Sequence, residues 1–147
     1  MYKKILIASD GSDISRRAAE HGFAIAKCTA AEVVAVFVID TRTLPGAHPI
    51  LPESMAPYYF SIMEELRKAA DATLAELAAQ GDQIGVKVSA RVIEGTPSAG
   101  ILEAAKETSA DLVVMGSHGR SGLGALIIGS TAQAVVHGAK TPVLLVR

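Results

Sequence analysis

The chain has 147 residues, of which 50% are hydrophobic and 20% are charged. This length predicts one domain over residues 1–147 that buries roughly two thirds of its unfolded surface, and the composition excludes a disordered chain. The 14 Lys and Arg residues nearly balance the 15 Asp and Glu residues, which gives a net charge of −1. No basic excess points to a nucleic-acid partner. No apolar run approaches the roughly 18 residues that span a membrane, and no signal peptide opens the chain.

The single cysteine, Cys28, has no partner for an internal disulfide. A lone thiol favours a reducing compartment, and we therefore expect a cytoplasmic protein with no membrane segment. Cys28 itself is expected to pack as a small buried hydrophobe.

The first elements along the chain read as strand, helix and strand. Ile5–Ala8 and Val33–Ile39 are short apolar runs without polar alternation, typical of parallel strands buried on both faces. Between them, apolar residues recur at helical spacing from an N-cap at Ser12 or Asp13 as far as Ala26.

The stretch Thr41–Pro57 holds four prolines and little periodicity, and we expect a mobile loop or lid there. A long apolar stripe from Phe60 to Leu77 follows and predicts a helix that packs on the core. Gly81 is expected to end this helix.

The remaining elements continue the alternation. Val86–Ile93 alternates in polarity and indicates a strand nearer a sheet edge, whereas Asp111–Met115 and Pro142–Val146 indicate buried strands. Thr96 precedes a proline and predicts a helix N-terminus, and Ser130–His137 predicts the last helix, with Gly138 as its stop. The order β-α-β-α-β-α-β-α-β predicts an α/β fold with helices on both faces of a doubly wound parallel sheet.

The segment Gly116–Thr131, GSHGRSGLGALIIGST, holds five glycines and begins directly after a predicted strand. In doubly wound sheets, ligands bind beyond the carboxyl ends of the strands. The segment ends where a helix begins, and the free N–H groups of a helix N-terminus favour an anion. A P-loop is excluded because no Gly-Lys pair is present, and Ile127 replaces the third glycine of a dinucleotide-binding fingerprint.

The spacing Gly116-x2-Gly119-x9-Gly129-Ser130 resembles the nucleotide-binding motif G-2x-G-9x-G-[S/T] of the universal stress protein family. The strings YKKILIASDGS, VFVID, VIEGTP, DLVVMGSHGRSG and TPVLLVR are also similar to that family, so the resemblance covers essentially the whole chain. It implies a flavodoxin-like, or adenine nucleotide alpha hydrolase-like, fold: three α/β/α layers around a five-stranded parallel sheet in the order 3-2-1-4-5. It also implies a homodimer, which pairing through the edge strand Pro142–Val146 would form.

The resemblance implies a set of nucleotide-binding residues. Asp10 is expected to contact the ribose, with Ala8 and Ser9 alongside, and Val38 to offer main-chain groups to adenine. The ribose and phosphates would be held by Met115, Gly116, Gly119, Gly129, Ser130 and Thr131. His118 and Arg120 lie within the motif, His118 as a ligand-lining or turn-stabilising residue and Arg120 as a phosphate contact or a solvated side chain. Ala8 departs from the family, in which some ATP-binding members have proline.

Several of these residues also have plainer interpretations. Asp10 could cap the first predicted helix, Asp40 could be a solvated carboxylate rather than a ligand contact, and Ser130 and Thr131 could act only as helix caps. The histidines and Cys28 lack metal-ligand spacing, so no protein metal site is expected, although Mg²⁺ could arrive with a triphosphate. No catalytic residue is predicted.

Three functions follow from these observations. The first is a regulator that binds ATP, or ADP or AMP, and changes its shape or partners in a stress response. The second is a slow ATP-hydrolysing enzyme, for which a cradle but no general base is evident. The third is a nucleotide-free dimeric scaffold, against which the intact glycines argue.

Overall fold

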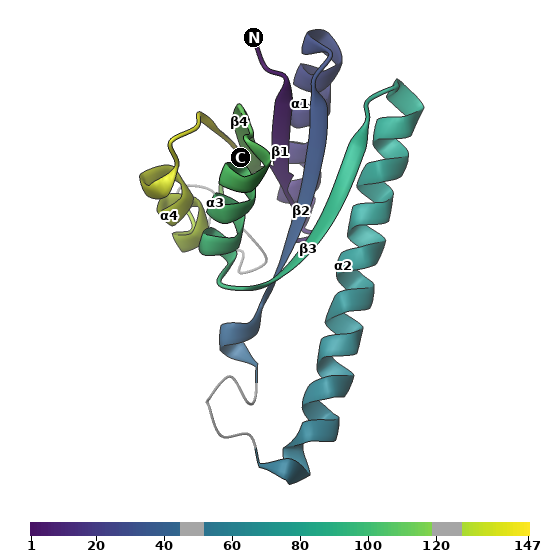
Figure 1. The fold of residues 1–147 in the computed structure, drawn as a ribbon, viewed down its shortest axis with the longest axis vertical. Coiled ribbons are helices and arrows are strands. Elements are labelled where there is room, and N and C mark those ends of the chain that lie inside the picture. The colour runs from purple at the N-terminus through teal and green to yellow at the C-terminus, as the bar shows by residue number, and fades with distance from the viewer. Residues whose placement is uncertain (45–51, 119–127) are drawn as a thin grey trace.

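The computed structural model describes residues 1–44, 52–118 and 128–147. In these residues five parallel strands form one sheet in the order β3-β2-β1-β4-β5 (Figure 1). The strands are β1 (Lys4–Ala8), β2 (Glu32–Asp40), β3 (Val88–Gly95), β4 (Leu112–Gly116) and β5 (Val143–Val146). The parallel sheet, its order and the position of β3 at an edge confirm the sequence-based expectation.

Helices cover both faces of the sheet, in agreement with the predicted three-layer α/β/α architecture (Figure 1). They are α1 (Asp13–Thr29), α2 (Ala56–Ile84), α3 (Pro97–Thr108) and α4 (Ser130–Gly138), with two short 3₁₀ turns, η1 (Thr41–Thr43) and η2 (Glu53–Met55). Helices α1 and α2 pack on one face, and α3 and α4 on the other. No helix in the described part of the chain is long and apolar enough to cross a membrane.

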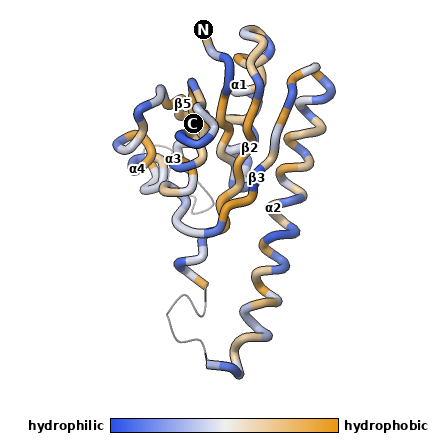
Figure 2. Tube along the Cα trace, viewed as in Figure 1, coloured by the Kyte–Doolittle hydropathy of each residue, from blue (hydrophilic) through white to orange (hydrophobic). Residues whose placement is uncertain are grey.

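Two hydrophobic cores sandwich the sheet because successive strand residues point to opposite faces. Ile5 and Ile7 of β1 join the core beneath α1 and α2, whereas Leu6 and Ala8 join the core beneath α3 and α4. Figure 2 shows the result, with hydrophobic residues concentrated on the strands and hydrophilic residues on the outer surfaces of the helices. The unalternating sequences of β1, β2 and β4 therefore reflect burial on both faces. The sequence also predicts that β5 is buried, but this strand lies at the sheet edge, and Val143, Leu144 and Leu145 are only partly buried.

The second helix is longer than the sequence indicates at both ends. It begins at Ala56, so Pro57 lies in its first turn rather than in a loop, and η1 and η2 occupy the two ends of the stretch Thr41–Pro57. Residues 45–51, the middle of the predicted lid, lie outside the described part of the chain. The first turns of α2 extend beyond the ends of the strands (Figure 1).

Gly81 does not end α2, contrary to prediction. The helix continues to Ile84 and stops at Gly85, whose φ of +74° is a left-handed conformation that favours glycine. Gly81 is instead buried within the helix, and a Cβ there would lie 2.2 Å from Val88 Cγ2 and 2.8 Å from Val86 O. This glycine allows α2 to approach the edge strand β3 closely. Gly138 is likewise the last residue of α4 rather than a residue beyond it.

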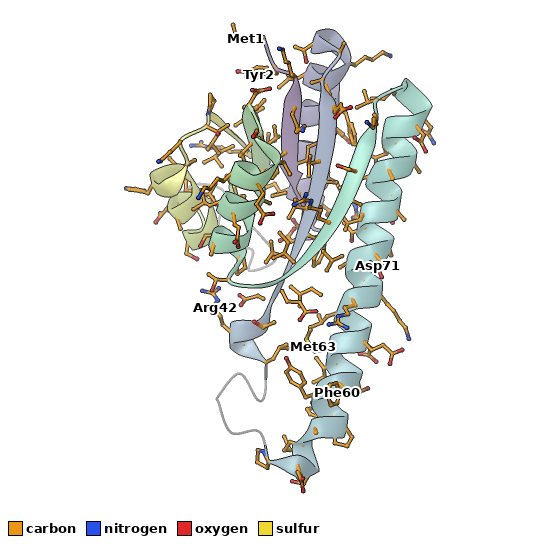
Figure 3. All side chains as sticks on the ribbon, viewed as in Figure 1. Met1, Tyr2, Arg42, Phe60, Met63 and Asp71 are labelled. Carbon is orange, nitrogen blue, oxygen red and sulfur yellow. The ribbon has the colours of Figure 1, made fainter. Side chains whose placement is uncertain are left out.

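Two further expectations about burial are wrong. Phe60 is 68% exposed although it belongs to the predicted apolar stripe, and it makes an edge-on contact with Tyr59. Phe60 lies on the part of α2 that extends past the strands, so no sheet lies beneath it (Figure 3). Cys28 is exposed on α1 rather than buried.

Replacing Gly81 with alanine is expected to destabilise the protein. A mid-helix Gly→Ala change normally gains about 1 kcal/mol, but the overpacking against Val88 should reverse the sign and leave a net loss of about 1–2 kcal/mol in the free energy of unfolding. Urea unfolding of Gly81→Ala, Val88→Ala and the double variant measures this effect. The loss should shrink in the Val88→Ala background, and a stabilised Gly81→Ala would contradict the packing argument.

Candidate functional site

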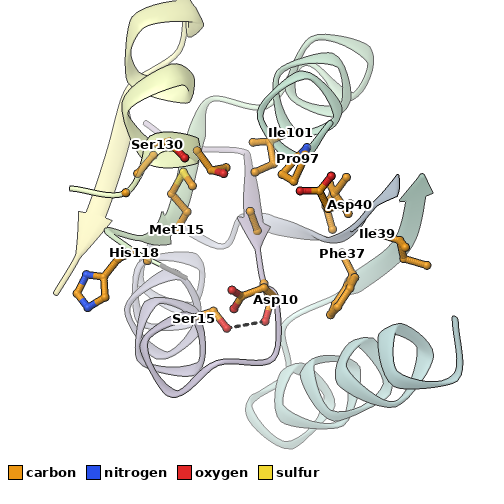
Figure 4. A pocket seen from close by; sticks show the side chains of 18 of the residues that line it. Asp10, Ser15, Phe37, Ile39, Asp40, Pro97, Ile101, Met115, His118 and Ser130 are labelled. Carbon is orange, nitrogen blue, oxygen red and sulfur yellow. Dashed lines mark hydrogen bonds between the residues drawn. The ribbon is translucent and has the colours of Figure 1, made fainter. Parts of the chain in front are cut away.

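A cavity of about 450 Å³ opens at the carboxyl edge of the sheet. Its walls are the ends of β1, β2 and β4 and residues at or near the N-termini of α1, α3 and α4, with α2 along one side (Figure 4). The sheet order reverses between β1 and β4, because β1 is followed on one side by β2 and on the other by a strand from the second half of the chain. This is where ligands bind in open α/β sheets, and the volume lies within the range of roughly 300–1,000 Å³ usual for ligand sites.

The turn from β1 into α1 forms one wall of the cavity. Gly11 adopts a φ of +78°, which turns the chain sharply, and Ser12 caps α1 by accepting from Ser15 N at 3.3 Å. Asp10 Oδ1 accepts from Ser12 N at 3.0 Å, so the carboxylate is held at the cavity by the turn itself. Ser12 is therefore the N-cap of α1, and the Asp10 carboxylate stabilises the turn that precedes this helix.

The buried hydroxyls of Ser9 and Ser15 also stabilise this turn. Ser15 Oγ donates to Ser12 O at 2.8 Å and lies 3.0 Å from Ser9 Oγ (Figure 4). Because the Ser15 proton is used by Ser12 O, Ser9 is the donor between the two hydroxyls. The backbone of Ser9 continues the sheet by donating from N to Val36 O at 2.9 Å.

The opposite wall is built where β4 ends and α4 begins. Ser117 N donates to Val146 O at 2.8 Å, and Ser117 O accepts from Gly129 N at 2.7 Å. These two bonds bring both ends of the glycine-rich segment together beside β5. The buried Ser117 hydroxyl lies 3.0 Å from His118 Nδ1 and orients that ring.

Helix α4 starts at the cavity without a side-chain cap, because its N-cap residue is Gly129. Its first intrahelical hydrogen bond runs from Gln133 N to Gly129 O at 2.9 Å. The N–H groups of Ser130, Thr131 and Ala132 lie before this bond and have no carbonyl acceptor within the helix. All three residues line the cavity. The positive end of the helix therefore faces the cavity and favours an anion.

Asp40 closes the third wall at the end of β2. Arg42 donates to it three times, from N and Nε to Oδ1 at 3.1 and 2.8 Å and from Nη2 to Oδ2 at 2.7 Å. The side-chain hydrogen bonds from Arg42 lower the pKa of Asp40, against a smaller opposing effect of burial. Asp40 is thus a partly exposed, ion-paired carboxylate on the cavity wall, which is compatible with either of its two interpretations.

All the residues that the sequence analysis named for the site, where the structure describes them, line this one cavity. They are Ala8, Ser9, Asp10, Val38, Met115, Gly116, His118, Gly129, Ser130 and Thr131. Gly119 and Arg120 lie outside the described residues. Within the part of the chain that the structure describes, no three His, Cys, Asp or Glu side chains cluster as metal ligands would.

Sequence reasoning missed a second group of lining residues. They are Ser15, Val36, Phe37, Ile39, Thr43, Leu44, Leu66, Ala69, Pro97, Ile101 and Ala132. The first turns of α1 and α3 could have been inferred, because helices that follow parallel strands begin at the same sheet edge. Leu66 and Ala69 could not, because they lie in the middle of α2 and reach the cavity only through tertiary packing.

Comparisons with known proteins agree over the whole chain. A family model described as the universal stress protein family matches residues 1–147. Universal stress protein MJ0531 of Methanocaldococcus jannaschii is 38% identical over 147 residues, which cover 100% of this chain and 83% of that protein. The solved structure of MJ0577, from the same organism, superposes with a TM-score of 0.85 at 29% identity and covers 99% of this chain and 96% of that one.

A nucleotide complex is among the similar solved structures. A universal stress protein in complex with cAMP superposes with a TM-score of 0.68 at 26% identity, and the match covers 99% of this chain and 97% of that chain.

The Arg42 interaction predicts how Asp40 titrates. Because folding lowers this pKa, the pair stabilises the protein above the unfolded value of about 3.9, and the contribution is lost as the pH falls through the folded value. NMR titration of the Asp40 carboxyl should show a higher midpoint in Arg42→Met than in the wild type. Arg91→Met, which breaks the separate pair with Glu107, should leave that midpoint unchanged; equal midpoints in all three proteins would refute the assignment.

Proposed function

The chain belongs to the universal stress protein family, and from this premise we propose that it binds an adenine nucleotide, with ATP as the principal ligand, in the cavity at the carboxyl edge of the sheet. The observation that carries the proposal is the uncapped N-terminus of α4, which faces a cavity of suitable volume beside Asp10 and the end of β2. The cAMP complex of a relative supports the same ligand class.

The phosphates belong at the start of α4. The N–H groups of Ser130 and Thr131 and their hydroxyls supply donors there, and the helix dipole adds a favourable field. No Lys or Arg is among the described lining residues, so main-chain donors carry the anion recognition in this part of the site. A Mg²⁺ ion would come with a triphosphate and bind largely through phosphate oxygens and water.

The glycines at this wall fit a ligand that lies against the main chain. A Cβ at Gly116 would lie 2.3 Å from Ile14 Cγ2, and one at Gly129 would lie 3.3 Å from His118 Cα and 3.4 Å from Ser117 O. Side chains at these positions would therefore press on α1 or on the main chain after β4, and would shift the walls against which the ligand is proposed to lie.

The base and sugar belong across the ends of β1 and β2. Asp10 is a hydrogen-bond acceptor suited to ribose hydroxyls, and Val38, two residues before the end of β2, would offer main-chain groups to the adenine edge. Ile101 and Met115, both nearly buried, provide apolar surface for the base on the same side of the sheet.

A nucleotide bound here would act as a regulator in a stress response, by favouring one arrangement of the protein over another. The segment after β2 couples most directly to the site, because Asp40 lines the cavity directly before the predicted lid Thr41–Pro57, and Thr43 and Leu44 line it from within that stretch.

Side chains introduced at Gly129 are expected to weaken ATP binding in order of size. The φ of −64° suits any residue, but a Cβ at position 129 would lie 3.3 Å from His118 Cα and 3.4 Å from Ser117 O. Alanine and then valine should therefore push the start of α4 away from the end of β4 and displace the N–H groups proposed to bind phosphate. We expect Gly129→Val to lose at least about tenfold in affinity, or about 1.4 kcal/mol. Calorimetric titration with ATP, together with thermal unfolding, measures both properties.

Ala134→Val is the matched control for this series, since Ala134 is exposed on the same helix and does not line the cavity. It should bind ATP like the wild type. If Gly129→Val also bound ATP with unchanged affinity, the phosphate position would be wrong.

We also propose that two copies pair through β5. This strand lies at the edge of the sheet. Val113 N donates to Pro142 O and Ser117 N donates to Val146 O, so every second residue bonds to β4, and the main-chain groups of Val143 and Leu145 face away from the sheet. An open strand edge is suited to antiparallel pairing with its twin across a two-fold axis.

Proline at position 143 tests this pairing. Val143→Pro removes an outward N–H without removing a bond to β4, and proline is tolerated at the first residue of a strand. Sedimentation velocity should detect a dimer for the wild type and for Val143→Ala, which loses the same side-chain contacts but keeps the N–H. Val143→Pro should shift toward monomer, and a dimer of unchanged stability would rule out this edge.

A further inference from the structure

The cavity extends around the end of β2 and has walls on both faces of the sheet. Val36 and Val38 point to the face covered by α3, whereas Phe37 and Ile39 point to the face covered by α1 and α2. All four side chains line the same cavity. The cavity therefore has two lobes, one on each side of β2.

The second lobe, which we call the β2–α2 lobe, is formed by Phe37, Ile39, Thr43, Leu44, Leu66 and Ala69. Its floor is rigid, since Phe37 is 5% exposed and Ile39 is 2% exposed in a packed core. Figure 4 shows both side chains between β2 and α2, on the side of the sheet away from Ile101 and Ser130. Thr43 is the single polar side chain among these six, so the lobe favours apolar groups.

Charge separates the two lobes. Asp10 and Asp40 both line the cavity, and Arg42 holds Asp40 through two side-chain bonds. A phosphate placed against Phe37, Ile39, Leu66 and Ala69 would meet apolar walls and would lose its hydration without gaining donors from these side chains. The β2–α2 lobe therefore excludes the anionic end of a nucleotide and accepts an uncharged group.

We propose that the β2–α2 lobe is a second subsite, which takes an apolar substituent on the base of an adenine nucleotide. This inference rests on the proposed function, since a base edge at Val38 lies beside Ile39 and Asp40, where the two lobes meet. A substituent on the exocyclic N6 amine would pass around the end of β2 onto Phe37 and toward Leu66. The ligand class is an N6-alkyl or N6-aryl adenine nucleotide.

N6-benzyl-ATP, compared with ATP, tests the subsite directly. Burial of the benzyl ring against this apolar floor should give the wild type about tenfold tighter binding of N6-benzyl-ATP than of ATP in calorimetric titrations. Ala69→Trp should block the lobe from its exposed rim and bring the ratio of the N6-benzyl-ATP affinity to the ATP affinity close to one, whatever its effect on ATP itself. Ala72→Trp adds the same side chain at an exposed position of α2 outside the cavity, and should keep the preference.

The outcomes separate the two proposals. If ATP binds but N6-benzyl-ATP binds equally or more weakly, the subsite is wrong and the nucleotide site stands. If the preference persists in Ala69→Trp, the benzyl group binds elsewhere and the subsite is also wrong. If neither nucleotide binds, both proposals fail.

Discussion

Ser117 is bonded through both of its main-chain groups, from its N–H to Val146 O at 2.8 Å and from Gly129 N to its carbonyl at 2.7 Å. These bonds join the ends of β4 and β5 to the start of α4. Because eleven residues separate Ser117 from Gly129, the closure costs chain entropy, which the buried position of Ser117 helps to offset. The closure places the N-terminus of α4 over the carboxyl edge of the sheet, and the candidate anion site depends on that placement.

The site combines few charges with many main-chain donors. Its described lining holds two carboxylates, Asp10 and Asp40, and no Lys or Arg, so among these residues the N-terminus of α4 is the main feature that attracts an anion. The carboxylates lie away from that helix end and disfavour a reversed ligand. Under the proposed function, a nucleotide would bind with its phosphates at α4 and its base toward β2, which would leave the β2–α2 lobe to uncharged groups.

Much of this arrangement can be predicted from the sequence, because parallel strands buried on both faces have short apolar runs, and because the glycine spacing of Gly116 and Gly129 marks a strand-to-helix connection. The ends of α2 could not be predicted. Gly81 and Gly85 look alike in the sequence, and only packing against Val88 distinguishes a close contact from a helix stop. Phe60 keeps the helical spacing of a core residue but lies beyond the sheet. The contribution of Leu66 to the cavity likewise depends on where α2 crosses β2, which no local pattern specifies.

The central claim is that the cavity holds an adenine nucleotide, and the most direct measurement is to identify what the protein carries. Freshly purified protein would be denatured and its released small molecules identified and quantified by mass spectrometry, with Gly129→Val purified in parallel. The account predicts an adenine nucleotide, chiefly ATP, at near-stoichiometric level in the wild type and little in the variant. Release of no nucleotide, together with failure to bind added ATP, would contradict it.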